Sequence, residues 1–332
     1  MRALYFEAPR CVTVREEPLA PPGDGEVMAE TLVSAISPGT ELRVYRGEVP
    51  RGMLVDSSIP ALAGEFAYPL RYGYAAVARV AELGAGVDAA WRGRLVVSLH
   101  PHQSHFLARP SELIPVPLGL SPEEAAFLPN VETAVNFLMD GRPIVGERVA
   151  VFGQKVVGLL TTALLARLPL AGLVALDRHP LRRRWSLELG AHDAVDPAET
   201  GVLDRLRGTA DLTYELSGDP AALDQAIAAT GFGGRVVIGS WYGDRPATLS
   251  LGGAFHRSRI QLVSSQVSTL APRWTGRWSK ARRLEVAWRM LAAVRPARLV
   301  THRFPLARAA EAYNLLDRRP EEAVQVLLTY ED

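Results

Sequence analysis

The 332-residue sequence has one cysteine, two lysines and almost no net charge. The single cysteine, Cys11, excludes an intrachain disulfide, a four-cysteine structural zinc site and a catalytic zinc held by two thiolates. It lies in a stretch of alternating apolar residues, so we expect it to be buried in a strand. Thirty-seven basic residues balance thirty-six acidic ones, which argues against nucleic-acid binding and against a polybasic membrane anchor.

Long hydrophobic segments are also missing. The longest largely apolar run, 156–166, is shorter than the about 20 residues that span a bilayer. The segment Met1–Glu7 reaches an acidic residue before an apolar core can form, which is atypical of a secretory signal. We therefore expect a cytoplasmic protein without membrane contact. With 48% apolar and 22% charged residues, the chain has a globular composition and room for about two domains.

The first part of the chain, up to about residue 125, consists of short β-favouring runs separated by turns rich in glycine and proline. This pattern predicts a barrel-like or sandwich module. The expected strands are 2–6, 11–15, 26–34, 77–83 and 95–99.

From about residue 145, strands alternate with helices of about ten residues, which predicts βαβ units and a doubly wound parallel sheet. Near the end, several arginines cluster around one helix, and we interpret them as a solvated face, with a phosphate or carboxylate site as the alternative. The expected strands are 148–152, 173–176, 211–216, 235–238, 299–304 and 323–328, the expected helices are 158–167, 182–189, 221–229, 280–293 and 307–316, and the arginines are Arg273, Arg277, Arg282 and Arg283.

A glycine-containing turn follows the strand 148–152 and opens a helix. Its sequence is Gly153-Gln154-Lys155-Val156-Val157-Gly158. Backbone N–H groups at such a helix N-terminus can receive the pyrophosphate of a dinucleotide. Nineteen residues beyond Gly158, at the end of the next strand, stands Asp177. A carboxylate there can accept the ribose hydroxyls and repels a 2′-phosphate, which favours NAD over NADP.

One residue departs from this dinucleotide fingerprint. Lys155 stands where a glycine normally lets the pyrophosphate approach the backbone. Its side chain is expected to crowd the phosphates, although its ammonium could pair with them instead. A βαβ turn that no longer binds a dinucleotide is the structural alternative.

Short motifs spread along the whole chain carry a further signal. They are Ser37-Pro38-Gly39-Thr40-Glu41, Gly73-Tyr74, Val80-Ala81-Glu82-Leu83-Gly84, Leu128-Pro129-Asn130, Thr133-Ala134, Gly146-Glu147-Arg148-Val149, the turn from Gly153 to Gly158, Asp177, Tyr214-Glu215-Leu216-Ser217-Gly218 and Gly233-Gly234-Arg235-Val236-Val237. Their order resembles the medium-chain dehydrogenase/reductase family, that is, the zinc-type alcohol dehydrogenases and their zinc-less quinone-reductase-like relatives. The resemblance is closest to the branch with bacteriochlorophyllide-type dehydrogenases. It implies an α/β fold with a Rossmann doubly wound parallel-sheet domain and a β-rich, barrel-like (GroES-like) catalytic domain.

The resemblance also implies where zinc ligands would stand, and the sequence departs from the family at each position. Pro38 replaces the first cysteine, Tyr74 replaces the histidine after Gly73, and Asn130 falls near the third ligand. Ala75 replaces the glutamate that would follow the histidine. Proline cannot ligate zinc, and tyrosine and asparagine are poor ligands. We therefore predict no zinc.

Three histidines stand in the place of the cysteine-rich lobe that would hold a second zinc. They are His100, His102 and His105. No obvious carboxylate is available to orient them as ligands, so we interpret them as surface or cleft histidines and predict no metal. Of the three, His102 is the best candidate for an acid/base group.

Without zinc, hydrogen-bond donors have to stabilise developing oxyanion charge. The resemblance places Thr40 at the family's proton-relay hydroxyl and Tyr74 in the emptied ligand site. We therefore predict Tyr74 as donor or acid and Thr40 as relay. The structural alternatives are packing of Tyr74 and capping, by Thr40, of a helix that starts near Glu41. Glu41, Asn130 and Glu132 are second choices.

The cofactor contacts that the resemblance implies lie in the second half of the chain. They are the turn residues Gly153, Gln154, Lys155, Val156, Val157 and Gly158 at the pyrophosphate, Asp177, Arg182 and Ser217 at the adenosine ribose, and Thr133, Ser240 and Gln266 toward the nicotinamide. Arg182 has an alternative interpretation as one of three consecutive surface arginines.

The sequence thus predicts a zinc-independent, NAD-dependent oxidoreductase that transfers a hydride to or from a carbonyl, alcohol or activated alkene. Its small-molecule substrate would bind in a cleft between a catalytic domain, 1–125 with 270–332, and a dinucleotide-binding domain, 126–269. The resemblance implies a homodimer. The alternative is a non-catalytic relative that binds a ligand or partner after losing zinc and efficient dinucleotide binding. Lys155 and the missing zinc ligands favour this alternative, and Asp177 speaks against it.

Overall fold

The computed structural model describes residues 1–50, 52–55 and 60–330. Its contacts divide the chain into two compact units. Unit 1 comprises Met1–Pro129 and Arg295–Asp332, and unit 2 comprises Asn130–Val294. Among the described residues, no helix is both long enough and apolar enough to cross a membrane.

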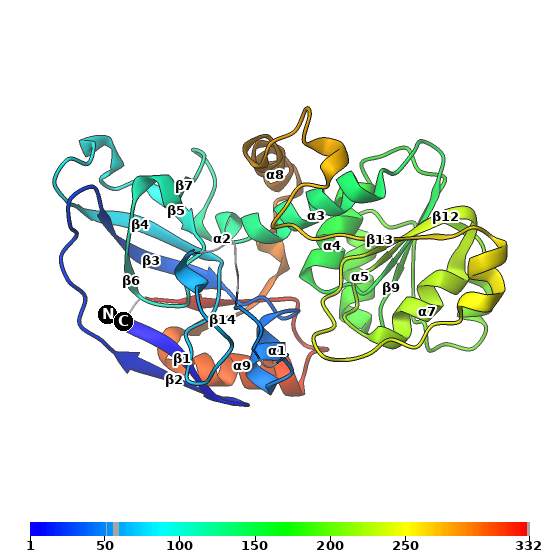
Figure 1. Cartoon of the computed structure of the whole chain (residues 1–332), viewed down its shortest axis with the longest axis horizontal. Helices are drawn as coiled ribbons and strands as arrows, with labels where there is room; N and C mark the ends of the chain where they lie inside the picture. The colour runs from blue at the N-terminus through cyan, green and yellow to red at the C-terminus, as the bar shows by residue number, and fades with distance from the viewer. Residues whose placement is uncertain (51, 56–59, 331–332) are drawn as a thin grey trace. The chain divides into compact units, whose positions relative to one another are not determined.

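Unit 1 is built mainly from strands, which form an antiparallel pair, β1–β2, and a larger sheet in the order β14-β15-β3-β4-β5-β7, in which β6 also pairs with β3. In Figure 1, β3 and β4 lie side by side within this larger sheet. The strands are β1 (Arg2–Ala8), β2 (Cys11–Glu16), β3 (Val27–Ala35), β4 (Ala76–Leu83), β5 (Leu95–Ser98), β6 (His105–Ala108), β7 (Ile114–Pro115), β14 (Val300–Pro305) and β15 (Gln325–Thr329), and the helices are α1 (Glu41–Arg46), α2 (Pro122–Ala125) and α9 (Ala309–Arg318).

The main core of unit 1 joins its two chain segments. Phe6 of β1, Leu42 and Tyr45 of α1, Tyr313 of α9 and Leu328 of β15 belong to one buried cluster. The Tyr45 and Tyr313 rings stack with centroids 5.4 Å apart. Burial of this apolar surface is what holds the C-terminal segment to the N-terminal strands.

Cys11 corrects one prediction. It is exposed rather than buried. Within β2, Val12 is buried and Val14 packs partly against the core, whereas Cys11 and Thr13 lie on the opposite face. Side chains alternate between the two faces of a strand, and the prediction assigned Cys11 to the wrong one.

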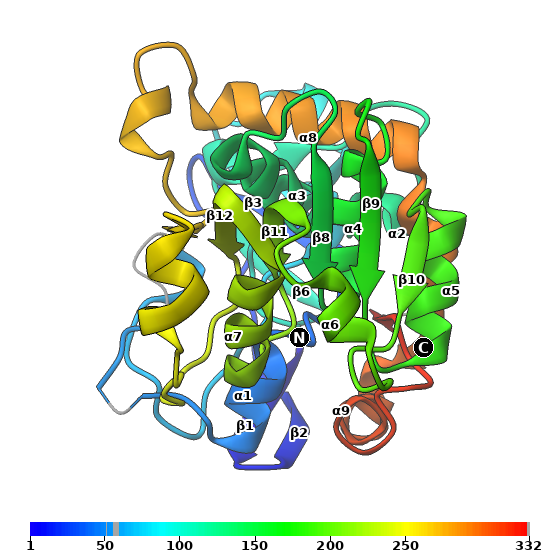
Figure 2. The ribbon, with the colours of Figure 1, turned by 90° about the vertical axis from the view of Figure 1, so that its right-hand side faces the viewer.

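Unit 2 contains a parallel sheet in the order β10-β9-β8-β11-β12-β13, which is the strand order of the dinucleotide-binding doubly wound fold. Figure 2 shows β11, β8, β9 and β10 side by side. The strands are β8 (Arg148–Phe152), β9 (Gly172–Leu176), β10 (Asp193–Val195), β11 (Ala210–Glu215), β12 (Thr230–Ile238) and β13 (Gln261–Ser264), and the helices are α3 (Leu128–Gly141), α4 (Val156–Leu165), α5 (Pro180–Glu188), α6 (Val202–Leu206), α7 (Pro220–Ala229) and α8 (Lys280–Val294).

Helices cover both faces of this sheet, as the composition of β8 requires. Val151 belongs to the same buried cluster as Leu165 of α4, and Phe152 belongs to the cluster of Ile227 of α7. Successive residues of a strand point to opposite faces, so the continuous apolar run of β8 buries both of its sides.

The predicted elements of unit 2 lie close to the observed ones. The strand 148–152 coincides with β8, while α4, α5 and α7 begin one or two residues before the predicted starts. Prolines stand in the first turns of α5 and α7, where a missing N–H is tolerated. No helix is predicted over 128–141, where α3 is found.

The predicted domain boundary near residue 270 differs from the observed boundary at Arg295. Helix α8 belongs to unit 2, and its Arg283 is hydrogen-bonded to that unit. The guanidinium donates to Glu132 and Asn136 of α3 and to the carbonyl of Val267.

Candidate active site

The turn between β8 and α4 requires both of its glycines. Gly153 has φ +89°, and a Cβ on it would lie 2.4 Å from Cα of Ser217. A Cβ on Gly158 would lie 1.9 Å from the carbonyl oxygen of Gly153. The turn therefore packs bare backbone against the end of β11, at the point where the strand order reverses and ligands of such sheets bind.

The N-terminus of α4 supplies a group of backbone donors. The N–H of Leu159 donates to the carbonyl of Lys155 at 2.9 Å and so begins the helical ladder. The N–H groups of Val156, Val157 and Gly158 precede that ladder, and such groups are the usual ligands of a pyrophosphate. Lys155, the N-cap residue, has φ −66° and ψ −178°, which is an ordinary extended conformation. Its backbone is therefore unstrained by the side chain.

Gln154 is fully buried, and its side chain points into unit 2. Its Nε2 donates to the carbonyl of Val151, and its Oε1 accepts from Thr162 of α4 and Ser186 of α5. The side chain thus ties two helices to β8, and only the backbone of Gln154 faces the turn.

Asp177 follows β9 and is 7% exposed. Its Oδ2 accepts the N–H of Gln154 at 2.8 Å, and its Oδ1 accepts the N–H of His179 at 2.9 Å. Arg182 Nη1 lies 3.7 Å from Oδ2. The carboxylate is therefore fixed beside the glycine turn, and its remaining lone pairs can accept hydroxyl donors.

A second buried carboxylate, Glu215, lies at the end of β11. It accepts the N–H of Ser217 at 2.9 Å and also the hydroxyls of Ser217 and Tyr242. Burial, together with the Glu215 charge, raises the pKa of the Tyr242 phenol, which stays a donor at neutral pH. The N–H of Gly218 donates to Ser240 Oγ at 2.8 Å. Glu215 thus contacts two predicted cofactor residues, Ser217 through its carboxylate and Ser240 through its backbone carbonyl, which accepts from Ser240 Oγ at 3.3 Å, although no role is predicted for it from the sequence. The sequence signals for Glu215 are its place in the motif Tyr214-Glu215-Leu216-Ser217-Gly218 and its position at the end of a strand.

The predicted nicotinamide contacts lie on α3 and after β13. Thr133 is half-buried, and Gln266 is exposed with its side-chain amide bonded to Ser268. The two segments are joined, because Asn136 of α3 donates to Ser265 Oγ at 3.0 Å.

Arg283 corrects the interpretation of the arginine cluster as a solvated face. It is 2% exposed, and its guanidinium lies 2.9 Å from the Glu132 carboxylate and donates to Asn136 at 2.7 Å. Arg282, its neighbour in the sequence, is exposed. Arg283 is therefore neither solvated nor open to an external anion, and Glu132, a second-choice catalytic residue, is its counter-ion.

In unit 1, the predicted catalytic pair is not joined by a hydrogen bond. The Tyr74 hydroxyl donates instead to Ser37 Oγ at 2.6 Å. Thr40 is the N-cap residue of α1, and its side chain makes no capping bond. The helix expected near Glu41 is present, but Thr40 does not cap it through its hydroxyl.

A buried polar network lies behind this tyrosine. Glu41 and His102 are both 0% exposed, and His102 Nε2 lies 3.0 Å from Glu41 Oε2. The Tyr313 hydroxyl donates to the same carboxylate oxygen. On the other side of the ring, Nδ1 lies 2.6 Å from Ser34 Oγ, which contacts the Tyr330 hydroxyl at 2.7 Å. The expectation of a surface or cleft histidine at His102 is therefore wrong.

The other two histidines do not converge on His102. His100 stacks on Phe106 with ring centroids 4.3 Å apart, and its Nδ1 lies 2.6 Å from Ser98 Oγ. Burial lowers the pKa of His100 to about 4, so it is neutral at pH 7. His105 contacts Ser104 Oγ at 3.0 Å. Within the described ranges, no three His, Cys, Asp or Glu side chains are grouped to hold a metal ion.

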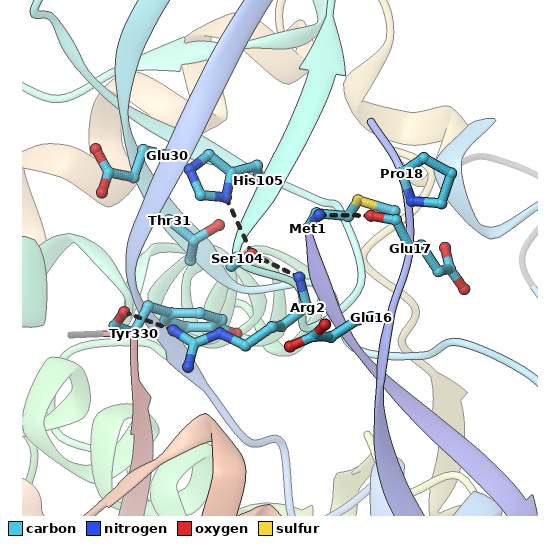
Figure 3. A pocket seen from close by; sticks show the side chains of 10 residues that line it. All are labelled: Met1, Arg2, Glu16, Glu17, Pro18, Glu30, Thr31, Ser104, His105 and Tyr330. Atoms are coloured by element: carbon cyan, nitrogen blue, oxygen red, sulfur yellow. Dashed lines mark hydrogen bonds between the residues drawn. The ribbon is translucent and has the colours of Figure 1, made fainter. Parts of the chain in front are cut away.

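Figure 3 shows a separate pocket of unit 1, with a volume of about 670 Å³. His105, Glu16 and Glu30 line it, together with Arg2, which donates to the carbonyl of Tyr330 at 3.3 Å. None of the predicted catalytic or cofactor residues is among the described residues that line this pocket.

Comparisons with known proteins show which proteins the chain is similar to. The family model described as "Zinc-binding dehydrogenase" matches residues 156–284, all within unit 2. The (R,R)-butanediol dehydrogenase of Bacillus subtilis is 28% identical over 255 residues, which cover 67% of this chain and 72% of that protein. In sequence, the chain is therefore similar to zinc-type alcohol dehydrogenases.

Solved structures of proteins named as alcohol dehydrogenases share the fold over nearly the whole chain. An alcohol dehydrogenase from Thermus sp. ATN1 matches with a TM-score of 0.79, 23% identity and 100% coverage of both chains. RspB from E. coli CFT073, solved with NADH, matches with a TM-score of 0.80, 18% identity and 99% coverage of both chains.

Three predictions are confirmed by these comparisons. They are the resemblance to the zinc-type alcohol dehydrogenases, the α/β fold with Rossmann and GroES-like domains, and a dehydrogenase as the class of enzyme, since the relatives are named dehydrogenases.

Proposed function

We propose that the chain is a zinc-independent dehydrogenase that prefers NAD and moves a hydride to or from a carbonyl, alcohol or activated alkene. Unit 1 would be the catalytic domain, and unit 2, with α8, the dinucleotide-binding domain. Family resemblance supports a homodimer, and the single cysteine supports a cytoplasmic location. The observation that carries the proposal is the fixed Asp177 carboxylate beside a glycine turn that a Cβ would fill.

The residues of unit 2 fit a dinucleotide. The N–H groups of Val156, Val157 and Gly158 would bind its pyrophosphate, and Asp177 would accept its adenosine ribose hydroxyls. When bound, the nicotinamide ring supplies or accepts the hydride. Ser217, held by Glu215, would bind the ribose beside the switch point of the sheet.

The preference for NAD follows from how Asp177 is held. Two backbone N–H groups fix its carboxylate, and the residue is nearly buried, so the charge cannot swing away from a 2′-phosphate. Arg182, at 3.7 Å, offsets part of that charge without neutralising the site.

Zinc independence follows from the chemistry of the ligand positions in unit 1. Pro38 has no donor atom for a metal, and the Tyr74 hydroxyl is engaged with Ser37. Tyr74 would hold the proton that a carbonyl oxygen receives, at its own hydroxyl oxygen. Ser37, rather than the predicted Thr40, is the hydroxyl in contact with it.

Calorimetric titration with NADH and NADPH tests the cofactor proposal. We expect NADH to bind at least about tenfold more tightly than NADPH, a difference of about 1.4 kcal/mol in binding free energy. Asp177→Asn should reduce the ratio of the two affinities. Equal affinities in the parent protein would refute the preference. Elemental analysis of the purified protein should find no stoichiometric zinc, whereas one tightly held zinc per chain would contradict the proposal.

The catalytic proposal needs a separate test. NADH oxidation would be followed with a panel of a ketone, an α,β-unsaturated ketone and a quinone. Tyr74→Phe should lower kcat by about 10²-fold or more, the usual range for a lost acid, and leave NADH binding intact. Full activity in this variant would remove Tyr74 from the mechanism.

A non-catalytic binding protein is the second candidate, and Lys155 is the observation that favours it. The lysine stands where the fingerprint has its middle glycine. No heat with either dinucleotide would support this alternative.

A further inference from the structure

We propose that Glu41 and His102 form a buried clamp that positions Tyr74 and Ser37. The clamp comprises the carboxylate of Glu41 and the imidazole of His102, whose contact at 3.0 Å is excluded from solvent. Neither residue reaches the surface, so both are positioning residues rather than catalytic ones. The inference rests on the proposed function, in which Tyr74 is the proton donor.

His102 controls the backbone that carries Tyr74. Gly73, which precedes the tyrosine, has φ +112°, and a Cβ on it would lie 2.6 Å from Cδ2 and Nε2 of His102. The imidazole therefore packs directly against bare backbone. Gly73 serves two needs at once, since its φ favours glycine and its missing side chain makes room for the ring.

Glu41 controls the partner of Tyr74. Its Oε1 accepts the N–H of Ser37 at 2.7 Å, and Ser37 Oγ in turn accepts the Tyr74 hydroxyl at 2.6 Å. One carboxylate thereby fixes the backbone of the residue whose side chain orients the proposed acid. The clamp thus holds both ends of the Tyr74–Ser37 hydrogen bond, one end through each of its members.

The clamp is itself held by three further hydroxyl groups. Tyr313 donates to Glu41, while Ser34 and Tyr330 follow one another on the Nδ1 side of His102. Burial and the Glu41 charge raise the pKa of Tyr313 well above its usual value, and burial raises the pKa of Tyr330. Both phenols are therefore donors at neutral pH.

The hydrogen bonds on the Nδ1 and Nε2 sides of His102 can all run in one direction. Tyr330 donates to Ser34, Ser34 donates to Nδ1 of His102, and Nε2–H of His102 donates to Glu41. Every partner is then satisfied without leaving a buried group unpaired. A fully satisfied buried network is rigid, which is what a positioning device requires.

The structure offers a direct spectroscopic test that needs no substrate. The protein is labelled with 3-fluorotyrosine, and the ¹⁹F resonance of Tyr74 is assigned by its disappearance in Tyr74→Phe. The test variants are Glu41→Gln and His102→Gln. The matched control is Asp317→Asn, which disturbs another nearly buried carboxylate of unit 1, one that pairs with Arg46 at 2.6 Å outside the clamp.

We expect the Tyr74 resonance to shift by more than its linewidth, or to split, in both clamp variants and to stay in place in the control. An unmoved resonance in folded Glu41→Gln would overturn the proposal. If His102→Gln does not fold, Tyr313→Phe takes its place, because it removes one donor to Glu41 and leaves the ring of His102 in position.

Kinetics separates this inference from the proposed function. In the clamp variants, kcat should fall about tenfold with KM for NADH unchanged, while Asp317→Asn keeps both values. If Tyr74→Phe is fully active but the resonance still moves in the clamp variants, the catalytic proposal fails and the clamp stands. If Tyr74→Phe is inactive but neither the Tyr74 resonance nor kcat changes in the clamp variants, the clamp proposal fails and the catalytic proposal stands.

Discussion

The two units hold their candidate site residues by different means. In unit 2, the edge of the sheet is shaped by bare backbone, since Gly153 and Gly158 admit no Cβ and the N–H of Gln154 holds Asp177. In unit 1, Tyr74 is held through side chains, chiefly Glu41 and its partners. A backbone site depends on a few consecutive residues, whereas a side-chain site depends on segments that only folding brings together.

The separations along the chain make this difference concrete. Gly153 and Gly158 lie within a single turn. By contrast, the hydrogen bond from Tyr313 to Glu41 spans 272 residues, and the contact between Ser34 and Tyr330 spans 296. A substitution at the backbone site should therefore act locally, through steric overlap. A substitution at the side-chain site should also affect the residues that are hydrogen-bonded to the one replaced.

The largest effect is expected at the backbone site. Gly158→Ala places a Cβ 1.9 Å from the carbonyl oxygen of Gly153, where nothing flexible can yield. We expect a loss of at least about 4 kcal/mol in the free energy of unfolding, measured by denaturant titration. The control is Gly276→Ala, where no atom of the described residues other than its chain neighbours lies within 4 Å of the added Cβ, and it should stay within about 0.5 kcal/mol of the parent. Equal stabilities of the two variants would contradict the steric argument.

At the side-chain site, substitutions of Glu41 and His102 should have non-additive effects on stability. His102→Leu removes one of the three donors to the buried Glu41 carboxylate, which should reduce the free energy of unfolding by about 1–3 kcal/mol. In a Glu41→Gln background, the same substitution should cost less, because the residue that loses the donor no longer carries a charge. A double-mutant cycle measures the coupling, expected at about 1–3 kcal/mol. Simple additivity of the two substitutions would mean that they do not act as a pair.

His100 of unit 1 should make the free energy of unfolding depend on pH. Its pKa is about 4 in the folded protein and 6.5 ordinarily, so between these values the unfolded chain binds more protons. Stability should therefore fall as the pH drops from about 6.5 to about 4, at about 1.4 kcal/mol per unit. At pH 5 the parent should have lost about 2 kcal/mol relative to pH 7 from this group.

Denaturant titrations of His100→Gln at pH 7 and pH 5 measure that contribution, since the variant should lack it. The matched control is His256→Gln in unit 2, which alters an exposed histidine. A parent and a His100→Gln variant with the same pH dependence would show that His100 is not held neutral.

The smallest effect is expected at Lys155. Its backbone is unstrained, so the outcome depends on its side chain alone. If the side chain crowds the pyrophosphate, Lys155→Gly should tighten NADH binding about threefold to tenfold, a change of about 0.7–1.4 kcal/mol, by calorimetry. Lys280→Ala alters the only other lysine and should leave binding unchanged. Weaker binding with a shallower salt dependence would mean that the ammonium recruits the phosphates.

Much of unit 2 could be predicted from the sequence. The apolar run of β8, the glycines at 153 and 158, and the acidic residue after β9 indicated the fold class and the place of the proposed dinucleotide site. These features act through local geometry, and a strand, a tight turn and a helix start are specified by neighbouring residues. Arg283 was not predictable in the same way, because its burial depends on the packing of α8 against α3.

In unit 1, the sequence by itself determined that the zinc-ligand residue types are missing, and the order of the motifs pointed to Tyr74. Only the tertiary structure decided that Ser37 rather than Thr40 accepts from Tyr74, and that His102 pairs with Glu41. The physical reason is that buried polar side chains must find partners, and those partners come from strands and helices far apart in the chain. Sequence spacing specifies a turn, but the partner of a buried histidine is decided by how the strands and helices pack.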